Sequence, residues 1–246
     1  MGDLRQRSKE ATLSKSTVVI SAAGIGRRMK TKGPKALIGL GSGETVLSRQ
    51  LLLTQASFPS AKIVVVVGHC AEKIISVLPK DVHYVVNEEY ERTNVARSFL
   101  LGIEAFPCDR AILLCGDLVF GKNFLNCLTK TGSIISVDAR PNHRQGEVGV
   151  NVDNGNAAHF TYGAFPRWAQ AVALEGVELE LYRNIAAQDR CARWFAYEVL
   201  NAIIDQDGRF AVAHPSRMSL VEIDQIQDVI RARRLASGSR RKGVAK

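Results

Sequence analysis

The chain has 246 residues, of which 46% are hydrophobic, and a formal net charge of +9. This length suits one large α/β domain or two small ones, and the hydrophobic fraction is typical of a globular protein with a true core. The sequence has no apolar run long enough to span a membrane, and its N-terminus lacks the apolar segment of a secretory signal. We therefore expect neither a membrane span nor a secretory signal.

The cysteines favour a cytoplasmic protein, and the distribution of charge indicates how the chain is divided. Five scattered cysteines without a CxxC pair predict reduced thiols. Much of the positive charge lies at the two ends, so we predict a mobile leader at 1–15, one domain at 16–237 and a disordered basic tail at 238–246. The chain carries no RRM, zinc-finger or helix-turn-helix pattern, so we expect no specific nucleic-acid partner.

The first half alternates apolar runs with helical patterns. Continuous β-branched runs predict strands buried on both faces, at 17–23, 62–68, 83–87 and 110–117. Helical segments follow the first three runs, at 44–56, 71–78 and 94–106. The alternation predicts a three-layer, Rossmann-like doubly wound α/β fold with a mostly parallel, mixed sheet. In such sheets ligands bind at the carboxyl ends of the strands.

The second half is less regular, and we expect it to complete the same sheet within a single domain. Strand patterns with turn signals between them occur at 133–139, 147–153, 156–163, 209–214 and 219–224. Amphipathic patterns predict helices at 190–205 and 225–236. We find no internal repeat and no interdomain linker.

A glycine turn followed by cations ends the first predicted strand. Gly24 and Gly26 allow backbone N–H groups to approach an anion closely, and Arg27, Arg28 and Lys35 come soon after. The stretch is not a Walker A loop, because GxxxxGK[ST] is absent, and it lacks the third glycine of the dinucleotide fingerprint. A lone GxG is equally compatible with an ordinary turn.

The wider pattern resembles the signature of the nucleotidyltransferase superfamily, whose members join a nucleoside triphosphate to a sugar phosphate or a similar phosphomonoester. "AAGIGRRM…GPKAL" (22–37) resembles the family's AAGxGxR followed by Pro-Lys-x-Leu, although Ser21 stands where leucine is usual. "NEEYERTNVARS" (87–98), "LLCGDLVF" (113–120) and "VEIDQIQDVIRAR" (221–233) resemble segments of the choline-phosphate cytidylyltransferase-like branch. All four motifs occur in family order.

The resemblance implies a role for each motif. Arg28 would hold the β- and γ-phosphates, and Lys35 would bridge the acceptor phosphate and the α-phosphate. Mg²⁺ would be bound by Asp117 and Asp224 with help from Glu222, since hard oxygen ligands suit this ion. The expected nucleotide-binding residues are Ala22, Ala23, Gly24, Ile25, Gly26, Arg27, Asn87, Asn94 and Ser98.

This set fits the chemistry of nucleotidyl transfer. A phosphate dianion is already a nucleophile, so the chief obstacle is repulsion between two polyanions, which fixed positive charge and positioning overcome. Each residue alone also has a simpler interpretation. Asp117 could cap a turn, Asp224 could be the N-cap of the last helix, and Asn87 and Asn94 could be turn and cap residues.

The residues do not determine which acceptor the enzyme would use. A choline-like acceptor would need aromatic faces, for which the candidates are Tyr162, Trp168, Trp194 and Tyr197. Trp194 and Tyr197 lie in an amphipathic pattern and also fit a core position. A polyol or sugar phosphate would need polar partners, for which the candidates are Arg140, His143 and Glu180.

The resemblance favours an enzyme that transfers CMP from CTP to a small phosphomonoester with release of pyrophosphate. Two alternatives stay open. One is a UTP- or GTP-dependent sugar-1-phosphate nucleotidyltransferase, and the other is a non-catalytic nucleotide-binding module of the same fold. Retention of Lys35, Asp117 and Asp224 argues against the second, because a sensor does not need the transfer lysine.

Overall fold

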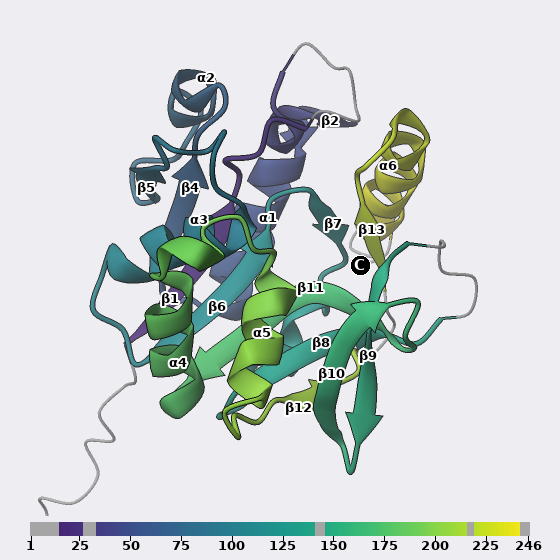
Figure 1. The fold of residues 1–246 in the computed structure, drawn as a ribbon. Coiled ribbons are helices and arrows are strands. Elements are labelled where there is room, and N and C mark those ends of the chain that lie inside the picture. Colours follow the sequence, from purple (N-terminus) through teal and green to yellow (C-terminus); the bar gives the residue numbers. More distant parts are fainter. Residues whose placement is uncertain (1–14, 27–32, 141–145, 216–218, 242–246) are drawn as a thin grey trace, which may run out of the picture.

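The computed structural model describes residues 15–26, 33–140, 146–215 and 219–241. Its centre is a nine-stranded mixed sheet in the order β5-β4-β1-β6-β11-β8-β12-β10-β9, with an additional pairing of β11 with β9 (Figure 1). The strands are β1 (Ser16–Ser21), β4 (Lys62–Val67), β5 (His83–Val86), β6 (Arg110–Cys115), β8 (Ile134–Asp138), β9 (Val148–Asp153), β10 (Asn156–Tyr162), β11 (Arg167–Glu175) and β12 (Ala211–Ala213).

The first half of the sheet is parallel, as its sequence predicts. β1 lies between β4 and β6 with all three running in one direction, and β5 continues the parallel set beyond β4. β1, β4 and β6 are buried on both faces, which explains their continuous β-branched sequences. The expectation of burial on both faces is wrong for β5, because it lies at the edge of the sheet and exposes Tyr84 and Val86. The carboxyl ends of β1 and β6 are aligned, since Ser21 is paired with Cys115.

Helices cover both faces of this sheet. Figure 1 shows α4 and α5 in front of the sheet and α1 behind it. The helices are α1 (Val46–Ser57), α2 (Ala71–Ile75), α3 (Val95–Glu104), α4 (Val177–Ala186), α5 (Ala196–Ile204) and α6 (Ile226–Arg241), with 3-10 turns at Lys35–Leu37, Leu125–Thr129 and Asp189–Cys191. The predicted three-layer α/β class is therefore confirmed. Among the described residues, no helix has the length and apolarity needed to cross a membrane.

Two short antiparallel pairs of strands lie outside the main sheet. β2 (Gly39–Gly41) pairs with β3 (Glu44–Thr45), and β7 (Leu118–Phe120) pairs with β13 (Leu220–Glu222). The segment 219–224 was expected to join the main sheet, and that expectation is wrong. A second, smaller core between α6, β2, β7 and β13 accounts for this arrangement, because it buries Val119, Ile223 and Val229 away from the main sheet.

The structure also corrects the predicted helix at 190–205. The helix α5 begins only at Ala196, because the Glu198 carboxylate accepts a hydrogen bond from the Phe195 N–H at 2.7 Å. The carbonyls of Ala192 and Trp194 accept hydrogen bonds from the start of α3 instead of continuing a helix. The last helix, in contrast, runs to Arg241 and enters the segment that was expected to be a disordered tail. Arginine is a good helix former, so the basic residues at its end can extend it.

Candidate active site

Asp117 stands at the carboxyl end of β6, where the chain turns sharply toward β1. The N–H of Gly116 donates to the Ser21 carbonyl at 2.8 Å. A Cβ at position 116 would lie 2.4 Å from that same carbonyl oxygen, so only glycine fits this close approach. The buried side chain of Gln50 holds the turn from the other side, because its amide donates to the carbonyls of Cys115 and Leu118. The Asp117 backbone is therefore fixed on both sides.

Glu222 and Asp224 reach Asp117 from the other end of the chain. The N–H of Ile223 donates to the Asp117 carbonyl at 3.0 Å, which aligns the end of β13 with the turn after β6. The fully buried Asp228 of α6 then accepts hydrogen bonds from the backbone N–H groups of Asp224 and Gln225. Asp228 belongs to the motif quoted above, but its role in fixing this turn could be seen only in the structure.

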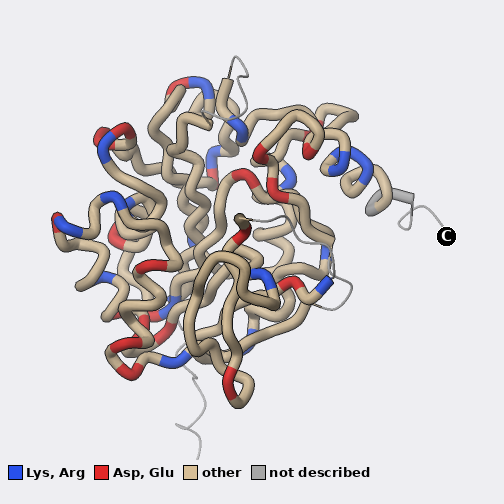
Figure 2. Tube along the Cα trace, turned by 45° about the vertical axis from the view of Figure 1, so that its right-hand side comes forward, with Lys and Arg blue, Asp and Glu red and all other residues tan. Residues whose placement is uncertain are grey.

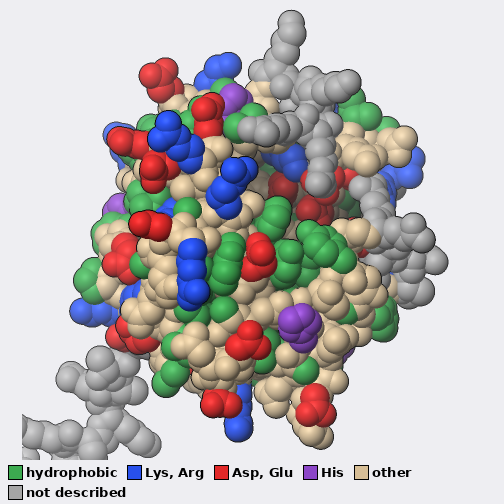
Figure 3. Space-filling model, in the orientation of Figure 1, with side chains coloured by type: hydrophobic (Ala, Val, Ile, Leu, Met, Phe, Trp, Pro, Cys, Tyr) green, Lys and Arg blue, Asp and Glu red, His purple; other side chains and the backbone are tan. Residues whose placement is uncertain are grey.

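These contacts bring three carboxylates together. One oxygen each of Asp117, Glu222 and Asp224 lies within 4.8 Å of the others, and all three side chains are partly exposed. Figure 2 shows acidic positions gathered beside the helix that leads to the C-terminus, and in Figure 3 acidic side chains lie in a hollow of the surface. Three hard oxygen ligands, from the turn after β6 and from the end of β13 and the turn that follows it, fit a hydrated Mg²⁺ ion.

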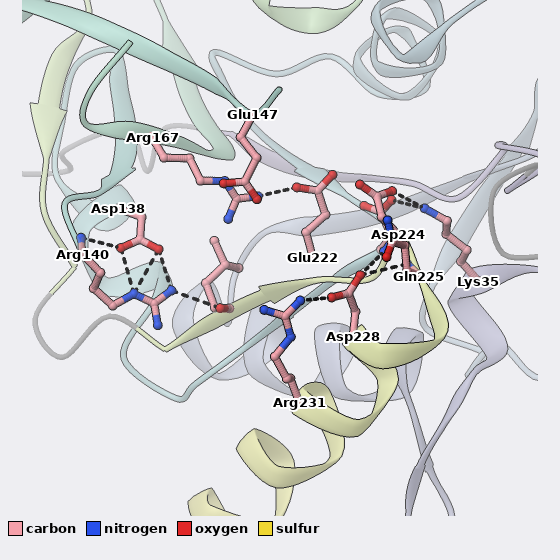
Figure 4. Close-up of polar contacts among 12 residues, drawn as sticks. Lys35, Asp138, Arg140, Glu147, Arg167, Glu222, Asp224, Gln225, Asp228 and Arg231 are labelled. Atoms are coloured by element: carbon pink, nitrogen blue, oxygen red, sulfur yellow. Dashed lines mark hydrogen bonds and ion pairs between the residues drawn. The ribbon is translucent and has the colours of Figure 1, made fainter. Parts of the chain in front are cut away.

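Lys35 connects the glycine-loop region with this acidic cluster. Its Nζ lies 3.0 Å from Asp117 Oδ2 and 3.0 Å from Asp224 Oδ1 (Figure 4). Burial acts to lower the pKa of Lys35, but the charges and hydrogen bonds of Asp117 and Asp224 outweigh it, so the pKa is raised overall. Lys35 is thus held as a cation at the centre of the site.

Glu222 is the most strongly perturbed carboxyl group of the cluster. Its burial and the nearby charges of Asp117 and Asp224 raise its pKa to about 7, although Arg167 acts in the opposite direction. The Arg167 guanidinium forms an ion pair with Glu222 and lies 3.3 Å from Glu147, as Figure 4 shows. Arg167 was not predicted, because nothing near it in the sequence distinguishes it from other arginines.

The glycine turn lies directly after β1, on the same edge of the sheet as Asp117. Ala22 and Ala23 are buried and hydrogen-bonded through the backbone to Val66 and His69, whereas Gly24 is exposed and Ile25 and Gly26 are partly exposed. Gly26 has φ of +65°, and the aliphatic stem of Lys35 packs against it. The predicted positions Arg27 and Arg28 lie outside the described residues.

The asparagine and serine predicted to contact the nucleoside form an internal network. The Asn87 amide donates to Thr93 Oγ1 at 3.0 Å and to Ser98 Oγ at 3.1 Å, and its oxygen accepts from the Glu89 N–H. Asn87 and Ser98 are buried. Asn94 is the N-cap of α3 and also donates to the Arg193 carbonyl. These contacts order the loop between β5 and α3 at the carboxyl edge of the sheet.

Aromatic side chains gather at the same edge. Tyr197 packs edge-to-face on Tyr162 and stacks with Phe195, with ring centroids 5.8 and 5.9 Å apart. We refer to Tyr162, Phe195 and Tyr197 as the aromatic trio. Phe195 and Tyr162 are 47% and 56% exposed, so their faces are accessible to a ligand. Phe195 was not among the aromatic candidates taken from the sequence.

Backbone contacts connect this trio to the acidic cluster. Tyr162 is paired with Val148, and the N–H of the following Gly163 donates to the Glu147 carbonyl. The Glu147 side chain in turn contacts Arg167, the ion-pair partner of Glu222. The trio is therefore connected to the carboxylates through Glu147 and Arg167.

The other acceptor candidates have different surroundings. Trp168 is buried in the core against Phe160, so its proposed contact with an acceptor is wrong. Trp194 is partly buried and packs against the main core. Arg140 pairs with the buried Asp138, and Glu180 pairs with Arg183 on α4. His143 lies outside the described residues.

Comparison with known proteins identifies the family. The family model of the MobA-like NTP transferase domain matches residues 18–190 of this chain. The chain belongs to this family. The predicted nucleotidyltransferase superfamily is thereby confirmed.

Relatives and solved structures of this kind extend the comparison. The bifunctional protein GlmU of Burkholderia mallei (strain SAVP1) is 33% identical over 139 residues, which are 56% of this chain and 28% of that protein. The chain thus spans less than a third of the length of such curated relatives. The inositol-1-phosphate CTP transferase from T. maritima has a TM-score of 0.74 at 18% identity, over 95% of this chain and 99% of the other. The CTP:phosphocholine cytidylyltransferase (LicC) from Streptococcus pneumoniae has a TM-score of 0.73 at 16% identity, over 90% and 99%. At these identities the two structures support the fold.

Proposed function

We propose that the protein transfers a nucleoside monophosphate, preferably CMP from CTP, to a small phosphomonoester and releases pyrophosphate. The observation that carries this proposal is the position of Lys35. Its ammonium group lies between two carboxylates at the edge of the sheet where the glycine turn ends. A transfer between two polyanions needs fixed positive charge at this point. The motif order and the two CTP-using structural neighbours support the choice of CTP.

The residues of the site have distinct tasks in this reaction. The backbone of the glycine turn lines the triphosphate, and Lys35 places its charge between the acceptor phosphate and the α-phosphate. Asp117, Glu222 and Asp224 are the residues that would hold Mg²⁺. When bound, this ion would neutralise phosphate charge in the transition state. The acceptor phosphate attacks in line as a dianion, so the chain need not supply a general base.

For the acceptor we propose a phosphomonoester with a cationic, choline-like end. The aromatic trio offers exposed rings and is connected to the acidic cluster through Glu147 and Arg167. An alkylammonium group is attracted to aromatic faces by cation–π interaction. A polyol would instead need several hydrogen-bonding side chains. Among the described candidates for that role, Arg140 and Glu180 are already paired with Asp138 and Arg183.

The test is a pyrophosphate-release screen of CTP, UTP, GTP and ATP against phosphocholine, phosphoethanolamine, inositol 1-phosphate and glucose 1-phosphate with Mg²⁺. We expect CTP with phosphocholine to give the highest kcat/KM. Release with UTP and a sugar phosphate would instead support the sugar-1-phosphate alternative. Tight nucleotide binding by calorimetry without turnover for any pair would support the non-catalytic module.

A further inference from the structure

Arg167 is a buried cation that the motifs of the chain do not include. Its side chain is only 7% exposed, and it forms ion pairs with two glutamates. Nε faces Glu147, at the start of β9, and Nη2 donates to Glu222, at the end of β13. A guanidinium is suited to such a bridge because its donors are fixed in one plane.

The position of Arg167 in the fold makes this bridge structurally important. Arg167 belongs to the main sheet, where it is paired with Asp138 of β8 and Gly149 of β9. Glu222 belongs to the separate pair of β7 with β13, which leads into α6. The ion pair therefore joins the main sheet to the segment that carries two of the three clustered carboxylates.

A second residue of β11 reaches the same carboxylate. The pairing of β11 with β8 shifts register between Trp168 and Val172, and Gln170 within this bulge has φ of +54°. A β-bulge reorients side chains and is frequent beside active sites. Here the Gln170 side chain comes close enough to Glu222 to act, as a hydrogen-bond partner, to lower the pKa of that carboxyl group. Two side chains of one strand thus converge on Glu222.

We infer that Arg167 is a positioning residue, assisted by Gln170, that holds the Glu222 carboxylate toward Asp117 and Asp224 for metal binding. This inference rests on the metal site of the proposed function. Without a partner, Glu222 would be repelled by the two neighbouring aspartates and would turn away from them. The guanidinium partly offsets this repulsion. In Figure 4 it lies on the side of the Glu222 carboxylate that faces away from Asp224.

The experiment measures Mn²⁺ binding to the full-length protein by electron paramagnetic resonance, without nucleotide or turnover. We expect Arg167→Met to raise the Mn²⁺ Kd by about 10- to 100-fold, the range found when groups that orient metal ligands are removed. Arg167→Lys keeps one ion pair but loses the planar bridge, so it should bind with intermediate affinity. Gln170→Leu should weaken binding less than Arg167→Met.

A double-mutant cycle shows whether Arg167 acts through Glu222. Adding Arg167→Met to Glu222→Gln should change the Mn²⁺ Kd by less than about twofold, because the group that Arg167 positions is already altered. Arg183→Met is the matched control, since Arg183 also contacts two glutamates, Glu104 and Glu180, outside the cluster. It should leave the Kd unchanged.

The outcomes separate this inference from the proposed function. Unchanged or tighter Mn²⁺ binding in Arg167→Met, with wild-type binding intact, would overturn only the positioning role. Absence of Mn²⁺ binding by the wild type would overturn the metal site itself. If Arg167→Met does not fold, as judged by circular dichroism, the Mn²⁺ Kd values of Arg167→Lys and Gln170→Leu test the inference instead. A wild-type Mn²⁺ Kd in both variants would contradict it.

Discussion

The two halves of the sheet supply the site with different kinds of groups. The parallel half, from β5 to β6, offers mainly backbone at its edge: a glycine turn, buried alanines and a self-contained Asn87–Ser98 network, with Asp117 at the end of β6. The other half, from β11 to β9, is mainly antiparallel, and we refer to it as the antiparallel half. It offers long side chains, namely Arg167, Glu147 and the exposed ring of Tyr162. Within the proposed function, the first half would serve the common triphosphate and the second would distinguish acceptors.

This difference has a physical basis. β1, β4 and β6 are buried on both faces, and the backbone N–H groups that follow β1 can bind the phosphates of any nucleotide alike. Antiparallel strands at the edge of a sheet can expose one face, so their side chains can vary without loss of the core. Changes in the parallel half should therefore affect all substrates, and changes in the antiparallel half should affect one acceptor more than another.

The largest effect is expected for Asp117→Asn. The substitution removes a charged metal ligand and one partner of Lys35 while keeping the shape of the side chain. A metal ion contributes several kcal/mol to charge stabilisation in such reactions, so turnover should fall at least about 10³-fold with every acceptor. The measurement is Mg²⁺-dependent pyrophosphate release, with thermal unfolding as the control for folding. Near-normal turnover would refute the metal assignment.

A smaller but more specific effect is expected for Lys35→Ala. If Lys35 stabilises charge that develops in the transition state, kcat should fall by about 10²- to 10³-fold while the Kd for triphosphate changes much less. Titration calorimetry gives the Kd and pyrophosphate release gives kcat. Lys62→Ala, at the amino end of β4, removes the same charge at the opposite edge of the sheet and serves as the control. Weaker triphosphate binding with an unchanged kcat would show that Lys35 is a ground-state tether.

The aromatic trio tests the antiparallel side of the comparison. Tyr162→Leu removes an exposed aromatic face but keeps an apolar side chain. Loss of one cation–π contact of about 1 kcal/mol should raise the KM for phosphocholine by about fivefold, with little change for triphosphate. Tyr84→Leu is the matched control, because Tyr84 is also exposed but lies on the edge strand β5. An equal effect of both substitutions would argue against an acceptor site at the trio.

The smallest expected effect is on stability and follows from the raised pKa of Glu222. The folded protein retains this proton up to about pH 7, whereas the unfolded chain releases it near 4.5. The folded state therefore binds more protons in this window, and the contribution of Glu222 to stability decreases as the pH rises from 4.5 to 7. Without metal, the free energy of unfolding of Glu222→Gln should decrease less over this range than that of the wild type. Parallel pH profiles from urea unfolding would contradict the assignment.

The sequence by itself determined the parallel half of the fold and most of the site. Continuous β-branched runs between helical segments predicted β1, β4 and β6, because burial on both faces leaves a local pattern. The edge strand β5 was also predicted, although one of its faces is exposed. The motifs also indicated Lys35, Asp117, Glu222 and Asp224, which the structure brings together although 189 residues separate the first from the last.

Only the tertiary structure decided the rest. Neither β11 nor α4 was predicted. The sequence of β11, "RWAQAVALE", is rich in alanine, and the strand is interrupted by the bulge at Gln170. Its role as the strand between β6 and β8 depends on partners distant in the chain. The same holds for Gln50 at the Asp117 turn and for Arg167 at Glu222, because each acts through a contact that no local pattern records. Local sequence specifies which segments are buried, whereas long-range pairing decides which side chains meet.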